Sequence, residues 1–125
     1  MKVLLDSDVV IEILRQHDAS ILSQWSELAG SEAQILTTPV TVAEIEAGAR
    51  PSEAKIIDRL FSLLECVPID EPAGKLAGEL MRRYSRSHSL EIADALIAAS
   101  ALRRQAALWT RNRKHYPMPE LVFYR

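Results

Sequence analysis

The sequence predicts an α/β layer fold with a short, mainly parallel central sheet. Short apolar runs alternate along the chain with longer segments whose apolar residues recur at helical spacing. With 125 residues, 48% of them hydrophobic, the chain is long enough for one core and too apolar to be disordered. We therefore expect a single domain over residues 1–125, without internal repeats or linkers.

Two strands and three helices are expected in the first part of the chain. Residues 2–5 form a continuous apolar run, which is typical of a buried strand. Residues 8–15 and 20–28 each have one apolar side and are predicted to be amphipathic helices. A second strand is expected over residues 34–37, and a short helix over residues 41–48.

Helices and strands continue to alternate in the rest of the chain. Residues 52–64 have apolar side chains at helical spacing, which predicts an amphipathic helix. Residues 90–102 are apolar nearly all round, which is typical of a buried helix. Ser89 is expected to cap that later helix. The predicted elements are, in order, an amphipathic helix over 52–64, a strand over 66–69, a helix over 71–86, the apolar helix over 90–102, and strands over 107–110 and 121–124.

Cysteine usage and the N-terminal residues bear on the compartment. Cys66 is the only cysteine, so the sequence has neither a disulfide framework nor the Cys/His spacing of a zinc site. Asp6, Asp8 and Glu12 interrupt the apolar stretch near the N-terminus, unlike a signal peptide. No run approaches the ~18 apolar residues of a membrane span. We expect a cytoplasmic protein that does not cross a membrane.

The net charge of −2 hides an uneven distribution of charge. The first 80 residues carry 6 Lys/Arg and 14 Asp/Glu, whereas the last 45 residues carry 9 and 3. The basic residues cluster in 82–86, 103–104 and 111–115. Such clusters suit a polyanion such as a nucleic acid. A solvated basic face, or ion pairs at the rim of a dimer, is the alternative.

Asp94 is unexpected on packing grounds, because it lies within the apolar helix predicted over residues 90–102. An ionised carboxylate in a buried helix is costly unless something compensates it. A bound cation would do so, and pairing with an arginine or with backbone amides is the alternative. Glu91 lies three residues earlier on the same side of the helix. It is either a further acid of a site or first-turn charge favoured by the helix dipole.

Asp6 directly follows the first predicted strand, and Thr110 and Asn112 lie at the end of the fourth. In parallel α/β folds, ligands bind outside the carboxyl ends of the strands. Asp6 is therefore expected at the rim where a site forms. Helix capping is the alternative for Asp6, although Asp8 can also cap that helix.

Glu44 is a third candidate ligand from a separate segment. Its alternative role is local, because Thr41 and Glu44 match the capping-box pattern. Together, Asp6, Glu44 and Asp94 form an all-oxygen set, which selects hard cations such as Mg²⁺ or Mn²⁺. With a basic half of the chain nearby, phosphodiester hydrolysis is the expected chemistry.

Four segments in this order resemble the PIN-domain ribonucleases, specifically the VapC-type toxins of VapBC toxin–antitoxin systems. They are residues 3–11 (VLLDSDVVI), 41–48 (TVAEIEAG), 92–101 (IADALIAASA) and 108–117 (LWTRNRKHYP). Their order and spacing extend the resemblance over essentially the whole chain. It implies a three-layer α/β/α PIN-like fold and an endoribonuclease that uses Mg²⁺ or Mn²⁺.

The resemblance also implies roles for particular residues. It carries over as metal ligands at Asp6, Glu44 and Asp94. The fourth acidic position of the family falls at Asn112, an amide that adds no charge. This departure favours one metal ion over two, although both numbers are compatible with the sequence.

Three neighbouring polar residues match further family positions. Ser7 and Thr110 fall at small hydroxyl positions and are expected to support the site by orienting water or phosphate. Asp8 falls at a position that is often Asn in the family, and we expect local support from it rather than metal ligation.

The family further implies an RNA substrate and protein partners. These are a cognate VapB-type antitoxin and a second toxin copy, giving a homodimer and a heterotetramer or larger complex. The apolar faces of residues 9–28 and 52–64 are candidates for the antitoxin groove, with ordinary core packing as the alternative.

Two other functions compete with this one. Residues 4–10 resemble the opening motif of haloacid-dehalogenase-type phosphatases, in which the first Asp is a nucleophile. The chain is short for that family, however, and has no paired acids near Asp94. A non-catalytic RNA-binding PIN homologue is the second alternative, which the substitution at Asn112 slightly favours.

Overall fold

A parallel sheet with strand order β3-β2-β1-β4 forms the centre of the computed structural model, which describes residues 1–125 except the side chains of Ser85, Ser87 and His88. Each neighbouring pair of strands is parallel. The strands are β1 (Lys2–Leu5), β2 (Gln34–Thr37), β3 (Glu65–Cys66) and β4 (Ala107–Trp109).

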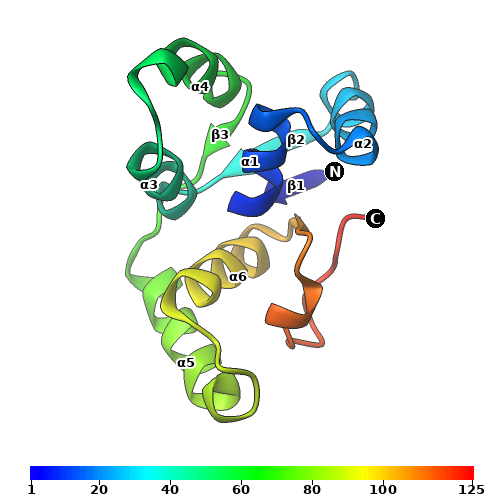
Figure 1. Ribbon diagram of the computed structural model, residues 1–125. Helices are drawn as coiled ribbons and strands as arrows, with labels where there is room; N and C mark the ends of the chain where they lie inside the picture. The colour runs from blue at the N-terminus through cyan, green and yellow to red at the C-terminus, as the bar shows by residue number, and fades with distance from the viewer.

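Helices cover both faces of this sheet, as the three-layer prediction required. In Figure 1, α1 to α4 lie on one side of the strands, and α5 and α6 lie on the other. The helices are α1 (Ser7–Arg15), α2 (Ala19–Ala29), α3 (Pro39–Ala47), α4 (Ala54–Phe61), α5 (Glu71–His88) and α6 (Ile92–Arg104), with short 3₁₀ turns η1 (Pro51–Glu53) and η2 (Arg113–His115).

Alternation along the strands builds a separate core on each face. Leu4 of β1 and Leu108 of β4 pack with the buried faces of α5 and α6. The intervening residues of β1, Val3 and Leu5, pack with α1, α2 and α4. The two neighbouring strands β1 and β4 are therefore buried on both faces, which explains their continuous apolar sequences.

The pairing of β1 with β4 fixes the position of the site. Leu5 lies opposite Trp109, and the Asp6 amide donates to the Trp109 carbonyl at 2.9 Å. The residues that follow these strands, Asp6 and Thr110, therefore emerge side by side at the carboxyl edge of the sheet. They are separated by more than a hundred residues of chain, and the two central strands bring them together.

Several predicted boundaries were wrong, and prolines explain three of them. The strand predicted over 66–69 ends at Cys66, because Pro68 has no amide hydrogen to continue the ladder. The helix predicted from Thr41 begins earlier, at Pro39, which suits the first helical turn. The helix predicted over 52–64 begins as a 3₁₀ turn at Pro51 and ends at Phe61.

Two further predictions about the C-terminal half were wrong. Ser89 does not cap α6, because that helix begins at Ile92 with Glu91 at its N-cap position. The strand predicted over 121–124 is only an isolated bridge between Leu108 and Phe123. This last segment runs beside β4 without forming a continuous ladder. Among the described residues, no helix has both the length and the apolar character needed to span a bilayer.

Candidate active site

Asp6 lies at the junction of β1 and α1, and its buried carboxylate accepts hydrogen bonds on both oxygens. Oδ1 accepts from the Ser7 amide at 2.8 Å, which makes Asp6 the N-cap of α1. Oδ2 accepts from the Thr110 hydroxyl at 2.9 Å and from the Tyr116 hydroxyl at 2.8 Å. Three donors converging on one carboxylate fix its orientation.

Asp94 lies in the first turn of α6, not within its apolar interior. The side chain is half-buried, and the fully buried stretch of the helix begins at Ala95. The packing argument that made Asp94 unexpected was therefore only partly correct. Its Oδ1 lies 3.5 Å from the Tyr116 hydroxyl, which also contacts Asp6. One phenol thus bridges the two carboxylates.

The pKa of Asp94 responds to the charges of other acids in the site. Burial raises the pKa of Asp94, and the charge of Asp6 raises it further. Glu91 and Glu44 act in the same direction, whereas His115 lowers the pKa. The acids predicted from three separate segments therefore repel one another at the carboxyl edge of the sheet.

Glu44 does not form the predicted capping box with Thr41. The α3 cap is Thr38, whose hydroxyl accepts from the Thr41 amide at 3.4 Å. Glu44 instead accepts a hydrogen bond from the Ser7 hydroxyl at 2.5 Å. The Ser7 hydroxyl also lies 3.2 Å from the Thr41 hydroxyl. Ser7 therefore connects Glu44 to the residue that follows Asp6.

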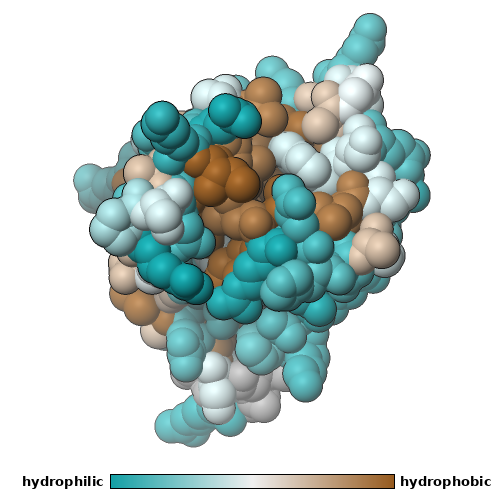
Figure 2. Space-filling model, turned by 45° about the horizontal axis from the view of Figure 1, so that its top comes forward, coloured by the Kyte–Doolittle hydropathy of each residue, from teal (hydrophilic) through white to brown (hydrophobic). Residues whose placement is uncertain are grey.

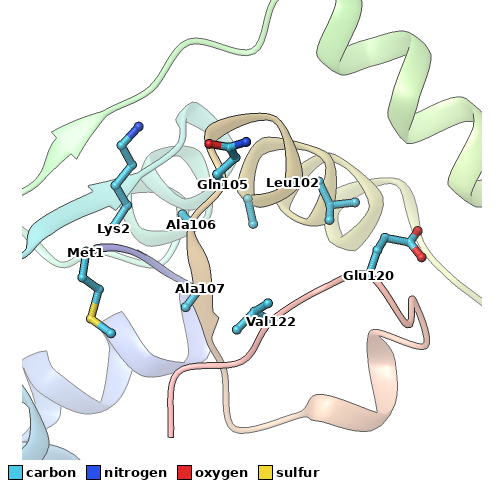
Figure 3. A pocket seen from close by; sticks show the side chains of 9 residues that line it. Met1, Lys2, Leu102, Gln105, Ala106, Ala107, Glu120 and Val122 are labelled. Atoms are coloured by element: carbon cyan, nitrogen blue, oxygen red, sulfur yellow. The ribbon is translucent and has the colours of Figure 1, made fainter.

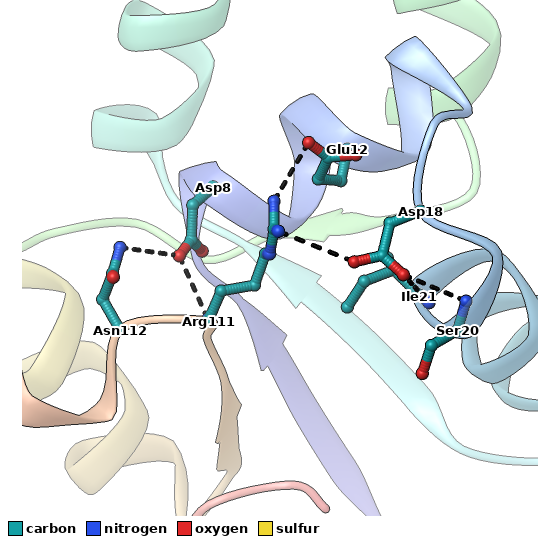
Figure 4. Close-up of polar contacts among 7 residues, drawn as sticks. All are labelled: Asp8, Glu12, Asp18, Ser20, Ile21, Arg111 and Asn112. Atoms are coloured by element: carbon teal, nitrogen blue, oxygen red, sulfur yellow. Dashed lines mark hydrogen bonds and ion pairs between the residues drawn. The ribbon is translucent and has the colours of Figure 1, made fainter.

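Asn112 faces Asp8 across the site's edge (Figure 4). The Asn112 side-chain amide and the Arg111 backbone amide both donate to Asp8 Oδ2, at 3.1 and 3.0 Å. The Asn112 backbone amide donates to the Thr110 hydroxyl at 3.0 Å. Asp8 does not cap α1, since Asp6 does. It instead holds the loop that follows β4.

The basic cluster over residues 111–115 is not a simple polyanion-binding patch. The Arg111 guanidinium lies 3.0 Å from Glu12 and 3.5 Å from Asp18, as Figure 4 shows. Arg113 donates to the Tyr124 carbonyl and lies over the Phe123 ring, 5.0 Å from its centroid. These two arginines are held by contacts within the fold, which neither the polyanion-binding prediction nor its alternatives, a solvated face and ion pairs at a dimer rim, had anticipated.

Two residues of this site were not predicted individually. Tyr116 is 3% exposed, and burial together with the Asp6 charge raises its pKa, so its hydroxyl stays protonated. His115 lines a cavity of about 390 Å³ with Ser89, Glu91 and Asp94. Both follow Asn112 within the fourth motif segment, but nothing in the spacing indicated that the Tyr116 hydroxyl would reach Asp6.

A second hollow, of about 410 Å³, lies at the opposite edge of the sheet (Figure 3). Its lining comes mostly from the end of α6, the start of β4 and the N-terminus. Glu120 is the only acid among the described residues that line it. The clustered carboxylates therefore distinguish the carboxyl edge as the candidate active site.

Comparison with known proteins agrees with this geometry. A model of the PIN domain family matches residues 3–121. The chain belongs to the PIN-domain family. This PIN domain is 36% identical over 119 residues to "Ribonuclease VapC10" of Mycobacterium tuberculosis, covering 94% of this chain and 88% of that protein. It is 32% identical over 120 residues to "Ribonuclease VapC19" of the same organism, covering 94% and 95%.

Solved structures share the fold of this PIN domain. VapBC2 from Rickettsia felis, bound to a DNA fragment from its promoter, superposes with a TM-score of 0.81 at 24% identity, covering 99% of this chain and 98% of that one. FitAcB from Neisseria gonorrhoeae gives 0.78 at 22% identity, covering 98% and 96%. Membership of the PIN-domain family removes the haloacid-dehalogenase alternative.

The donors in this PIN domain fit a hard cation by their chemistry. Asp6, Asp94 and Glu44 offer carboxylate oxygens, which Mg²⁺ and Mn²⁺ prefer. The bridging Tyr116 hydroxyl shows that two of these carboxylates lie close together. Among the described residues, no three Asp, Glu, His or Cys side chains converge as a ready-made metal cage. Mg²⁺ needs no such cage, because it retains several water ligands.

Proposed function

We propose that this PIN domain is a metal-dependent endoribonuclease and the toxin of a type II toxin–antitoxin pair. The observation that carries the proposal is the pairing of Asp6 and Asp94 around the Tyr116 hydroxyl at the carboxyl edge of the sheet. The similarity to proteins named VapC ribonucleases supports RNA as the substrate.

Asp6, Asp94 and Glu44 would hold Mg²⁺ or Mn²⁺. When bound, such a cation supplies an activated water and stabilises the leaving oxygen of the phosphodiester. The chain's own residues prepare the ligands. Thr110 and Tyr116 donate to Asp6 and fix its orientation, and Ser7 holds the Glu44 carboxylate by a hydrogen bond.

Mutual repulsion among the acids supports the proposal that a cation binds here. The pKa of Asp94 is raised first by burial and then by Asp6. A divalent cation held by Asp6, Asp94 and Glu44 would offset that repulsion. The Asn112 amide, which contacts Asp8, adds no charge to the site.

A hydrophobic hollow of about 120 Å³ between α1, α3 and α4 supports a protein partner. Ile11, Leu14, Ile45, Ala49 and Ile57 line it, with Glu44 at its border. Figure 2 shows apolar surface within a hydrophilic rim on this side of the molecule. We propose that the cognate VapB-type antitoxin inserts an apolar segment here, beside the active site. The assembly would contain a toxin homodimer and form a heterotetramer or larger complex.

Cleavage of total RNA by the purified protein tests the activity. We expect discrete fragments with Mg²⁺ and none with EDTA. Asp94→Asn should reduce the rate about 100-fold or more, as loss of a key electrostatic group does. Glu46→Gln is the matched control, because Glu46 is an exposed acid on α3. This variant is expected to cleave RNA at the wild-type rate.

The same assay separates the remaining alternative. If this protein is an inactive RNA-binding homologue, the wild type will bind RNA in a mobility-shift assay but produce no fragments under any metal condition. Fragments that survive both EDTA and Asp94→Asn would contradict the metal-dependent mechanism.

A further inference from the structure

The Asp8 carboxylate lies in surroundings that are unfavourable for a charged side chain. Its Oδ2 accepts from the Arg111 and Asn112 amides. Its Oδ1 is buried and has no hydrogen-bond partner among the described residues. A neutral Asn at this position could accept the same bond from the Arg111 amide without burying a charge. The charge of Asp8 therefore calls for a reason other than local structure.

Asp8 is connected to Asp6 by a short path of hydrogen bonds. Asp8 accepts from the Arg111 backbone amide and from the Asn112 side-chain amide. The Asn112 backbone amide donates to the Thr110 hydroxyl. Thr110 in turn donates its hydroxyl proton to Asp6 Oδ2. The hydroxyl has one proton, so accepting from Asn112 leaves that proton directed at Asp6. The orientation of Thr110 thus depends on the loop that Asp8 holds.

Neutralisation of Arg111 does not account for Asp8. The guanidinium pairs with Glu12 and Asp18, and only the backbone amide of Arg111 contacts Asp8. Glu12 itself has one buried oxygen without a partner among the described residues. This edge of the site thus has more carboxylate than its arginine balances. The surplus charge lies on the side of Asp8, next to Asp6.

We propose that Asp8 is a positioning residue for the Asp6 carboxylate, acting through the Arg111–Asn112 loop and the Thr110 hydroxyl, and that it supplies the negative charge that Asn112 lacks. This inference rests on the proposed function, because it assigns Asp6 to metal binding. It implies that the acid and the amide at positions 8 and 112 can exchange places.

Three variants test the proposal: Asp8→Ala, Asp8→Asn and the exchange Asp8→Asn with Asn112→Asp. The exchange keeps one charge and one amide facing each other, and the new Asn still accepts from the Arg111 amide. Asp58→Asn, an exposed acid on α4, is the matched control. The readouts are Mn²⁺ affinity by calorimetry, the backbone amide resonances of Thr110 and Asn112, and kcat and KM for RNA cleavage.

We expect Asp8→Ala to weaken Mn²⁺ binding about 10- to 100-fold, as loss of a residue that orients a ligand does. It should shift the Thr110 resonance and lower kcat with little change in KM. Asp8→Asn should lie between Asp8→Ala and wild type, and the exchange should restore Mn²⁺ affinity to within about 3-fold of wild type. An unchanged Mn²⁺ affinity and Thr110 resonance in Asp8→Ala would overturn the proposal, as would an exchange variant no better than Asp8→Ala.

Failure of the proposed function is read separately. If the wild type binds Mn²⁺ but cleaves no RNA, the ribonuclease proposal fails while the calorimetry still decides the role of Asp8. If the wild type binds no Mn²⁺, metal binding by Asp6 fails, and this inference fails with it.

Discussion

At the scale of a single residue, the ionised form of Asp8 is unfavourable for the stability of the fold. Burial raises the pKa of Asp8 from 3.8 to about 6, and the charge of Asp6 contributes in the same direction. The backbone amide of Arg111 lowers it only partly. A raised carboxyl pKa favours the protonated form in the folded state. The contribution of Asp8 to stability is therefore fully present below pH 4 and lost as the pH rises through about 6.

We predict from this that Asp8→Asn stabilises the metal-free protein at pH 8. A shift of two units corresponds to about 3 kcal/mol for a fully buried group, and partial exposure of Asp8 reduces the expected gain to about 1 kcal/mol. The gain should shrink as the pH is lowered from 8 towards 4. Urea unfolding at several pH values in EDTA measures it. A variant less stable than wild type at pH 8 would show that the charge supports the fold.

The sequence indicated Asp6 and Asp94 but not the contacts that organise them. Asp6 could be predicted because it follows a buried strand directly, and Asp94 because an acid interrupted an apolar run. Tyr116 could not, because its role depends on the path of the chain after β4. The Ser7 bond to Glu44 likewise joins segments 37 positions apart, which no local pattern specifies.

The start of α2 illustrates how one residue can serve two elements. Asp18 caps α2 by accepting from the Ser20 and Ile21 amides at 3.0 and 3.2 Å. Its other oxygen lies 3.5 Å from the Arg111 guanidinium in the loop after β4. The α2 cap and the active-site loop are thereby held together.

We predict that Asp18→Ala and Asp18→Asn differ in a way that separates these two contacts. Asp18→Ala removes the cap and should lower the free energy of unfolding by about 1 kcal/mol. Asp18→Asn keeps a capping oxygen but no charge for Arg111, and should cost less than about 0.5 kcal/mol. Chemical denaturation of both variants checks this. Equal losses would mean that the ion pair, and not the cap, is the stabilising contact.

Among the elements, the two strands of the first part of the chain were predicted with correct bounds, and the last segment of the sheet was not. Strands β1 and β2 have the predicted bounds, and the continuous apolar run of β1 marks a strand buried on both faces. The segment over 121–124 has the composition of a strand, yet it pairs at one position only. Whether an outer segment completes a ladder depends on tertiary packing, which propensity does not specify.

The two faces of the sheet differ in the surface that their helices present. One core packs between the sheet and α5–α6, whereas the opposite side carries the hydrophobic hollow between α1, α3 and α4. If an antitoxin binds there, one surface substitution can separate inhibition from catalysis.

We predict that Leu14→Glu weakens binding of the cognate antitoxin about 100-fold while RNA cleavage by the free toxin is retained. A charge placed in an apolar groove leaves that charge desolvated in the complex. Val122→Glu is the control, since Val122 is 64% exposed and lies on another face. Affinity for the antitoxin, measured by titration calorimetry, and RNA cleavage are compared for both. Unaltered inhibition of Leu14→Glu would place the antitoxin elsewhere.

The pairing of β1 with β4 also has a consequence for how the protein is made. Asp6 is synthesised more than a hundred residues before Thr110 and Tyr116, whose hydroxyl groups orient it. A nascent chain from which Thr110 and Tyr116 have not yet emerged therefore lacks these contacts to Asp6, however much of the preceding chain has folded. The proposed nuclease activity would be withheld from RNA near the ribosome until those two residues have emerged and folded.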